Sequence, residues 1–407
     1  MGSQGEENRS SAGNWCTSLK RVVVLGGGPA GAMAAAQLAN AGIETIVFDE
    51  KLAWEKPCGG GLTFKAYEKY PFLIDNDTPK RVVTETVLAA PRAGHARMKL
   101  SRPMLIYSRM DLNNMMLERA GKAGASIEKA RVHDVEQIGN RWRIHTKTSS
   151  VDADHCIVAT GARNPFRNLG TEWTAADTMT ALGYYVPVKQ EHVDIQFLPQ
   201  LEGYIWVFPR CGHLSVGICG KGESAQSLRQ RLENYMREKG IDLKDAKFYG
   251  HMLPSLETPG WKKNRLAGDG WMAVGDAGGL VDPITGEGLY YAMRSADLAC
   301  QLILDGKHSQ GERSSAYCNL LRTDFINDLE FGASLAKRLF LGKFLFRSAP
   351  TRMVEYIHRS PRFQELMQDL FAGTQNYLDI KERFLKTLNF TLQEILVNSF
   401  LRRIVVG

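Results

Sequence analysis

The stretch VVVLGGGPAGAMAAAQLANAGIETIVFDE, residues 22–50, decides the fold of this chain. It begins with a β-branched strand, continues through a glycine-rich turn into an alanine-rich helix, and closes with a second strand that ends in two acids. The spaced glycines are Gly26, Gly28 and Gly31, and the acids are Asp49 and Glu50. The glycines follow the pattern G-x-G-x-x-G, and the first acid lies 23 positions after the first glycine. A unit of this order and length is typical of a Rossmann-like site for a dinucleotide.

Each residue type in the turn has a physical reason. Gly26 permits a tight turn, Gly28 lets the backbone approach a pyrophosphate, and Gly31 lets helix and strand touch. Pro29 and Ala30 open the helix, whose free N–H groups and dipole attract an anion. We therefore expect these five residues to hold the phosphates of a dinucleotide.

The acid at the end of the second strand is expected to accept hydrogen bonds from the adenosine ribose hydroxyls. Asp49 fits this role by position, and Glu50 stays an alternative because boundaries inferred from sequence shift by a residue or more. The unit alone does not identify the dinucleotide.

Length and composition fit an enzyme-sized chain of two or three domains. Apolar residues make up 44% of the 407 positions, which is enough for globular cores, and 23% are charged. No run of about 18 residues is free of charge or strong polarity, which argues against an integral membrane protein. The 7 cysteines are scattered, so we expect neither a disulfide scaffold nor a metal site. Residues 1–20 lack an apolar run and read as a flexible leader, and we infer a cytoplasmic location.

Three regimes follow one another along the chain. Residues 21–49 and 105–160 alternate β-branched runs with helical stretches, as in a parallel βαβ sheet. Residues 80–104 and 180–253 hold short alternating runs that predict an antiparallel sheet, and the chain from Gly286 onward is mostly helical in pattern. The predicted domains are a discontinuous dinucleotide-binding domain (21–78, 105–176 and 265–330), an antiparallel-sheet substrate domain (79–104 and 177–264) and a helical C-terminal region (331–407).

The excess positive charge is concentrated in the C-terminal region. The chain carries a net charge of +7, and residues 331–407 hold 12 Lys and Arg against 6 Asp and Glu. An ordinary solvated helical face explains this surplus, and contact with an anionic membrane surface is the alternative. No motif for nucleic acid accompanies it, so we do not expect a nucleic-acid partner.

Three further stretches carry a resemblance to a known family. They are EKPCGGGLT at residues 55–63, YIWVFP at residues 204–209 and WMAVGDAGGLVDPITGEGLYYAMRSAD at residues 271–297. With the N-terminal unit, they resemble the geranylgeranyl reductase family of FAD-dependent oxidoreductases, within the hydroxybenzoate-hydroxylase-like flavoprotein superfamily. The resemblance covers about residues 20–300 and implies that the dinucleotide is FAD, bound in a Rossmann-like α/β domain interleaved with the antiparallel-sheet domain.

The resemblance also implies further cofactor-binding residues. Asp276, after Gly275, would bind the ribityl or pyrophosphate part of FAD, and Gly286 and Gly288 would open a helix directed at the flavin. Arg109 would contact FAD from the start of another helix. The remaining positions are Cys58, Gly59 and Gly60 of the CGG turn and Gly161 of an Ala-Thr-Gly stretch.

That last stretch departs from the superfamily, which often shows Ala-Asp-Gly where this chain has Ala159-Thr160-Gly161. The aspartate associated with FAD and NADPH handling is missing. NADPH or NADH as the transient reductant therefore stays an open expectation.

Strand residues at alternate positions share a face, so Tyr204, Trp206 and Phe208 are expected to form one aromatic wall. In the family this run lines the cavity that faces the flavin, which implies an apolar, extended or ring-shaped substrate. Tyr204, Trp206 and the site-lining thiol Cys58 are the candidate catalytic residues. A proton could come from Tyr204, from Tyr184 or from water.

By resemblance, the reaction is the saturation of isoprenoid C=C bonds by hydride transfer from the flavin to a prenyl-type apolar substrate. Hydroxylation by a flavin-dependent monooxygenase is the alternative. Halogenation ranks lower, because the related W-x-W-x-I-P run and its lysine are not matched here. A non-enzyme alternative is an FAD-stabilised scaffold that engages a membrane or protein through the basic C-terminal region.

Overall fold

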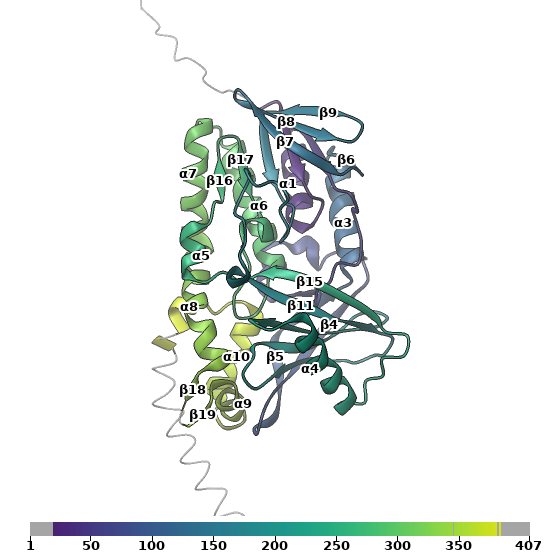
Figure 1. Ribbon diagram of the computed structural model, residues 1–407, viewed down its shortest axis with the longest axis vertical. Helices are drawn as coiled ribbons and strands as arrows, with labels where there is room; N and C mark the ends of the chain where they lie inside the picture. The colour runs from purple at the N-terminus through teal and green to yellow at the C-terminus, as the bar shows by residue number, and fades with distance from the viewer. Residues whose placement is uncertain (1–18, 345, 381, 384–407) are drawn as a thin grey trace, which may run out of the picture.

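A computed structural model describes residues 19–344, 346–380 and 382–383 of the chain. Residues 1–18 of the predicted leader and residues 384–407 of the predicted C-terminal region lie outside the described residues. The described part contains two main sheets, one above the other along the long axis of the molecule, with C-terminal helices running along one side of both (Figure 1).

The upper sheet has six strands and holds the N-terminal glycine-rich unit. Its order is β16-β17-β10-β1-β2-β6, parallel except for the edge strand β16. The strands are β1 (Arg21–Leu25), β2 (Glu44–Phe48), β6 (Ser126–Glu128), β10 (His155–Val158), β16 (Ala267–Gly268) and β17 (Trp271–Ala273). The central strands are apolar on both sides, as expected for a parallel sheet covered on both faces.

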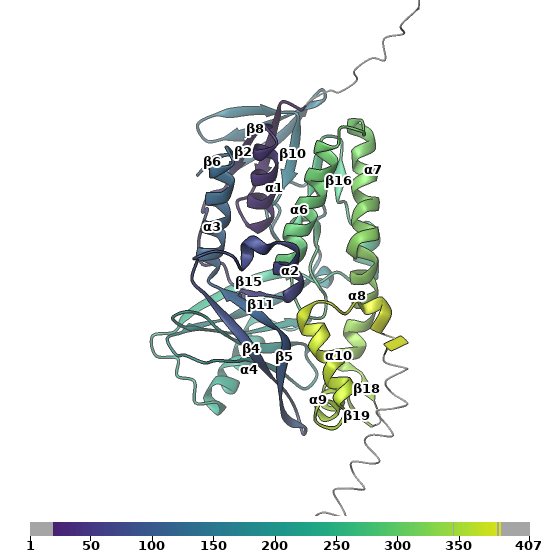
Figure 2. The same ribbon diagram turned by 180° about the vertical axis from the view of Figure 1, so that it is seen from behind.

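One face of this sheet is covered by helices and the other by a small meander. The helices are α1 (Pro29–Asn40), α3 (Arg109–Lys122) and α6 (Leu289–Leu304), and α1 packs between the other two (Figure 2). The meander is β7 (Val132–Ile138), β8 (Arg141–Thr146) and β9 (Ser150–Ala153).

The meander corrects the βαβ pattern expected over residues 105–160, because no second helix follows α3 before β10. In β8 the side chains of Trp142 and Ile144 are buried against the sheet while Arg141 and Arg143 face outward. This alternation with a period of two is that of an antiparallel strand with one open face.

The lower sheet has eight strands in the order β15-β11-β14-β13-β12-β4-β5-β3. All neighbours are antiparallel except β12 and β4. The strands are β3 (Gly61–Leu62), β4 (Lys80–Ala90), β5 (Gly94–Tyr107), β11 (Thr178–Val186), β12 (Val193–Phe197), β13 (Glu202–Pro209), β14 (Leu214–Lys221) and β15 (Lys247–Pro254).

Helices cover both faces of the lower sheet. On one face, Ile205 and Val207 of β13 pack against α4 (Ala225–Glu238). On the other face, Trp206 shares a core with the C-terminal helices α8 (Asn327–Leu341), α9 (Ala349–Arg359) and α10 (Pro361–Ala372). The C-terminal helices thus cover the aromatic side of β13.

Short elements connect these layers. They are α2 (Phe64–Lys69), the 3-10 turns η1 (Pro71–Leu73), η2 (Ala175–Asp177) and η3 (Gly275–Gly278), α5 (Thr258–Lys263), α7 (Gln310–Leu321), a π-helical turn (Arg322–Ile326), and the hairpin of β18 (Lys343–Phe344) and β19 (Arg347–Ser348). No helix within the described ranges is both long and apolar enough to cross a bilayer. The predicted fold class, a Rossmann-like α/β domain with an antiparallel sheet and a helical C-terminal region, is confirmed.

Candidate active site

A cavity of about 890 Å³ lies where the two sheets meet the C-terminal helices. Its walls include the glycine-rich turn after β1, the CGGG segment before α2, the segment between η3 and α6, and the aromatic face of β13. Segments far apart in sequence therefore share one continuous space.

The glycine-rich turn forms one end of this cavity. At Gly26, where φ is +111°, a Cβ atom would lie 2.3 Å from the carbonyl oxygen of Ala159, and at Gly31 it would lie 1.9 Å from the carbonyl oxygen of Gly26. Gly28 lines the cavity and a Cβ atom there would meet no protein atom within 4 Å. Gly31 thus serves packing, whereas Gly28 leaves room for a ligand at the N-terminus of α1, which has no side-chain cap.

The two candidate acids point in different directions. Asp49 lines the cavity and braces the turn: one carboxylate oxygen accepts from the Gly27 N–H at 2.7 Å, and the other from the Leu52 N–H at 2.8 Å. Glu50 is absent from the cavity lining, and its half-exposed side chain faces Arg131 at 3.7 Å. The geometry favours Asp49.

Asp276 lies in the cavity wall beside Lys56, with Nζ and Oδ2 3.3 Å apart. Burial alone would raise the pKa of Asp276, but the charge of Lys56 and the neighbouring His251 outweigh it and lower the pKa. Gly275, predicted as a cofactor residue, does not line the cavity; it packs against α6, where a Cβ at Gly275 would lie 3.1 Å from Cβ of Ala292. Lys56 was missed from sequence although it stands two residues before Cys58 in the quoted segment.

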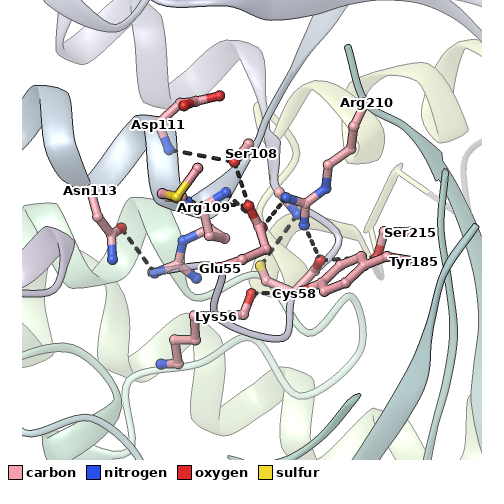
Figure 3. Close-up of polar contacts among 12 residues, drawn as sticks. Glu55, Lys56, Cys58, Ser108, Arg109, Asp111, Asn113, Tyr185, Arg210 and Ser215 are labelled. Atoms are coloured by element: carbon pink, nitrogen blue, oxygen red, sulfur yellow. Dashed lines mark hydrogen bonds and ion pairs between the residues drawn. The ribbon is translucent and has the colours of Figure 1, made fainter. Parts of the chain in front are cut away.

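Two arginines approach Cys58 in the cavity wall (Figure 3). Burial would raise the pKa of this thiol, but the charges of Arg109 and Arg210 and the Gly60 N–H, 3.3 Å from the sulfur, lower it below its usual value. Arg109 is 4% exposed and donates to Asn113 at 3.3 Å, and within the described residues its Nε has no hydrogen-bond partner. The site therefore holds positive charge with unused donor capacity.

The pair of Glu55 and Arg210 fastens the CGGG segment to the lower sheet and to the start of α3. The guanidinium of Arg210 donates to the Glu55 carboxylate and to the Cys58 carbonyl, and Ser215 of β14 also donates to that carbonyl at 3.1 Å (Figure 3). Glu55 in turn accepts from the Arg109 N–H at 3.0 Å, at the start of α3. Sequence reasoning missed this pair, because its members lie 155 positions apart and belong to no shared motif.

The three aromatic residues of β13, Tyr204, Trp206 and Phe208, all line the cavity. The Tyr204 hydroxyl donates to the carbonyl of Thr285, and its ring stacks on Phe340 of α8 with centroids 6.5 Å apart. The prediction that Tyr184 could supply a proton is wrong. Tyr184 lies in the core on the other face, donates to Glu233 and does not line the cavity.

The C-terminal helices supply a large apolar part of the cavity wall. The side chains include Leu335, Phe340, Met353, Phe363, Met367 and Phe371. The sequence of this region carries no recognisable motif, and we did not expect it to contribute to the site. Its role follows only from the packing of α8, α9 and α10 over the sheet.

The cavity fits a flavin dinucleotide. It offers the open space at Gly28, the uncapped N-terminus of α1, the unused Nε of Arg109 and the N-terminus of α6, which starts after Gly288 with no side-chain cap. Of the other predicted cofactor residues, Pro29, Ala30, Gly59, Gly60, Gly161 and Gly286 also line it. No group of three or more His, Cys, Asp or Glu side chains in the described ranges could hold a metal ion.

A fold of this kind around such a site defines a class: the chain is a flavin-dependent oxidoreductase. The family model for pyridine nucleotide-disulphide oxidoreductases matches residues 20–181. The chain is also similar to geranylgeranyl diphosphate reductase of Synechocystis, with 25% identity over 82% of this chain and 86% of that protein. Menaquinone reductase of Mycolicibacterium smegmatis is 28% identical over 82% of this chain and 87% of that protein.

Solved structures show the same fold. A geranylgeranyl bacteriochlorophyll reductase-like protein of Thermoplasma acidophilum aligns with a TM-score of 0.73 and 21% identity, over 91% of this chain and 98% of that one. A flavin-dependent brominase aligns with a TM-score of 0.67 and 15% identity, over 90% and 98% of the two chains. The resemblance inferred from sequence is confirmed: the chain is an FAD-dependent oxidoreductase that is similar to geranylgeranyl reductases, and also to menaquinone reductases.

Proposed function

We propose that the protein saturates C=C bonds of a prenyl chain, using FAD held at the upper end of the cavity. One observation carries this proposal: the same cavity runs from the glycine-rich turn to the aromatic face of β13 and the apolar side chains of the C-terminal helices. A space of this composition suits a hydrocarbon chain, since each buried CH₂ group contributes about 0.8 kcal/mol. The prenyl and quinone names of the relatives point to the same substrate class.

The residues that would hold FAD come from four segments. Asp49 and the turn at Gly26 and Gly28 would hold the adenosine and pyrophosphate, and Arg109 and Asp276 would hold the middle of the molecule. Bound FAD supplies the hydride that an unactivated double bond requires. The helix dipole at the start of α6 favours negative charge near Gly286 and Gly288.

The protein's own part is to orient the chain and exclude water. Tyr204, Trp206 and Phe208 would hold the reacting double bond from one side by stacking and burial. Cys58 would line the site with a thiol whose pKa is lowered by Arg109 and Arg210, and would form no covalent bond. The C-terminal helices would contact the rest of the hydrocarbon.

The reductant of the flavin is proposed to be NADPH or NADH. Two cations, Lys56 and Arg163, line the cavity near Gly161, where the family aspartate is replaced by Thr160. Anaerobic titration with each nicotinamide, followed through the flavin absorption, tests this part separately.

The substrate proposal is tested by a pair of aromatic variants. Trp206→Leu is expected to bind FAD normally but to raise the KM for geranylgeranyl diphosphate by about 10-fold, from the loss of stacking and buried area. Phe248→Leu, at an exposed aromatic on β15 of the same sheet, is the matched control and should leave the KM unchanged. If both variants behave like the wild type, the aromatic face does not contact the substrate.

Turnover of the prenyl substrate with and without oxygen also tests the hydroxylation and halogenation alternatives. If product forms only in air and carries a new oxygen or halogen atom, one of these alternatives replaces the reductase proposal. Contact of the basic C-terminal region with an anionic membrane also stays a prediction.

A further inference from the structure

Glu287 stands between Gly286 and Gly288, just before α6, and faces the cavity. The carboxylate oxygen Oε1 accepts a hydrogen bond from the hydroxyl of Thr63, 3.0 Å away, in the segment that follows the CGG turn. Thr63 also lines the cavity. Two segments that frame the expected flavin position therefore meet at this carboxyl group.

Asp282, five positions earlier, is a second buried carboxyl with very different hydrogen bonding. It is 6% exposed and accepts from the Ile284 and Thr285 N–H groups at 2.8 and 2.9 Å. The Tyr377 hydroxyl lies 2.9 Å from both of its oxygens. Burial raises the pKa of Asp282, but these donors stabilise its anion and oppose that rise, whereas Glu287 accepts from the single hydroxyl of Thr63.

Few positive charges lie near the two carboxyl groups of Glu287 and Asp282. The titratable neighbours of Glu287 are Asp282 in its own loop, Tyr290 and Tyr291 in α6, and Lys65 in α2. Asp328 in α8 and Tyr377 adjoin Asp282. Lys65 is the cation among these groups, and its ammonium lies over the Tyr290 ring at 4.5 Å.

This environment sets the protonation of Glu287. Burial raises its pKa first, and the negative charge of Asp282 raises it further; the Thr63 hydroxyl and Lys65 oppose both, and the result is about 7. A carboxyl with a pKa near the working pH is well suited to give a proton and to recover it.

The position of the segment relative to the aromatic wall completes the geometry. The Tyr204 hydroxyl donates to the carbonyl of Thr285, two residues before Glu287, and a Cβ at Gly286 would lie 3.2 Å from that hydroxyl. Burial also raises the pKa of Tyr204 well above its usual value, and its proton is engaged with Thr285. Tyr204 is therefore a poorer acid than Glu287.

We propose that Glu287 is the acid that protonates the substrate double bond, an inference that rests on the proposed function. One alkene carbon takes the proton as the O–H bond of Glu287 breaks and a C–H bond forms. The neighbouring carbon takes the hydride, with its electron pair, from reduced FAD. The products are a saturated bond, oxidised flavin and the Glu287 carboxylate, which regains its proton from water. The faces of Tyr204 and Trp206 stabilise positive charge at the carbon that awaits hydride.

The test uses the full-length protein loaded with FAD and reduced without oxygen. Geranylgeranyl diphosphate is added and flavin reoxidation is followed in a single turnover. Glu287→Gln should slow this step by about 10²-fold or more, while FAD content and reduction by dithionite stay unchanged. Wild-type reoxidation should slow as the pH rises above about 7, and the variant should lose this dependence. Glu118→Gln, on the exposed side of α3, is the control and should match the wild type.

Two further readouts keep the inference separate from the proposed function. Thr63→Val removes the donor that lowers the pKa of Glu287, so the pH at which reoxidation slows should rise. Infrared spectra at pH 6 should show a protonated carboxyl band that disappears in Glu287→Gln. If Glu287→Gln reoxidises at the wild-type rate and with the wild-type pH profile, the inference about Glu287 is wrong but the proposed function is unaffected. A wild-type enzyme that no prenyl compound reoxidises would overturn the proposed function and the proton transfer with it.

Discussion

The guanidinium of Arg210 and the carboxylate of Glu55 form an ion pair, and no part of the Arg210 side chain is exposed. The pair joins the strand end at Pro209 to the start of α3 and to the cavity wall at Cys58. A buried pair of this kind contributes little net energy, but loss of one partner leaves an uncompensated charge.

Arg210→Met is therefore expected to lower the free energy of unfolding by about 3–5 kcal/mol, measured by urea denaturation. The matched control is Arg97→Met, which removes the exposed pair of Arg97 and Glu85. Arg97→Met should lower the free energy of unfolding by no more than about 1 kcal/mol. Equal decreases in the two variants would show that the Arg210 ion pair does not stabilise the fold.

Cys58 is expected to react with iodoacetamide at lower pH than a free thiol, whose pKa is about 8.5. The reason is the positive charge of Arg109 and Arg210 beside the sulfur, which outweighs burial. In Arg210→Met, the pH at which Cys58 reaches half of its maximal alkylation rate should be higher than in the wild type. Peptide mass spectrometry follows Cys58 and the exposed Cys211 in one sample. Bound FAD should protect Cys58 and leave Cys211 reactive; equal protection of both would contradict the site.

Gly28→Ala is expected to separate cofactor binding from folding. A Cβ at Gly28 meets no protein atom, so the flavin-free variant should unfold like the wild type. The added methyl group would stand where the pyrophosphate approaches, so the Kd for FAD should rise by about 10-fold or more. Flavin fluorescence titration measures it. A Kd that Gly28→Ala leaves unchanged would place the pyrophosphate elsewhere.

Glu287 should make stability depend on pH in a direction opposite to that of an ordinary ion-paired acid. Its pKa is about 7 in the fold against 4.5 for an unperturbed glutamate, so the folded state holds more protons between these values. Stability must then fall as the pH rises through this window, by up to about 3 kcal/mol, and stay lower above it. Glu287→Gln should remove this loss and be relatively more stable at pH 8 than at pH 5. If the free energy of unfolding depends on pH in the same way in the wild type and in Glu287→Gln, the pKa of Glu287 is not raised.

Local patterns were sufficient to predict the parts of the fold that neighbouring residues determine. The unit at residues 22–50 forms β1, α1 and β2 with Gly26, Gly28 and Asp49 at one end of the cavity. The alternation in YIWVFP likewise places Tyr204 and Trp206 on the face opposite Ile205. In both cases the strand period or glycine spacing determines the geometry.

Other features depend on contacts between distant segments, and no local pattern carries them. The helices after Phe331 show no motif, and they enter the cavity wall only because the lower sheet exposes an apolar face for them to cover. The meander at residues 132–153 was missed because a short alternating strand resembles those of a βαβ unit until its pairing is known. Glu287 was passed over between two glycines that were themselves predicted as cofactor residues.

The most direct test of the central claim is a single anaerobic turnover of the reduced, FAD-loaded protein with geranylgeranyl diphosphate. We predict that the flavin is reoxidised without oxygen and that the product, analysed by mass spectrometry, carries two more hydrogen atoms for each flavin oxidised. A flavin that stays reduced beside the unchanged alkene, and is reoxidised only when air is admitted, would contradict the account.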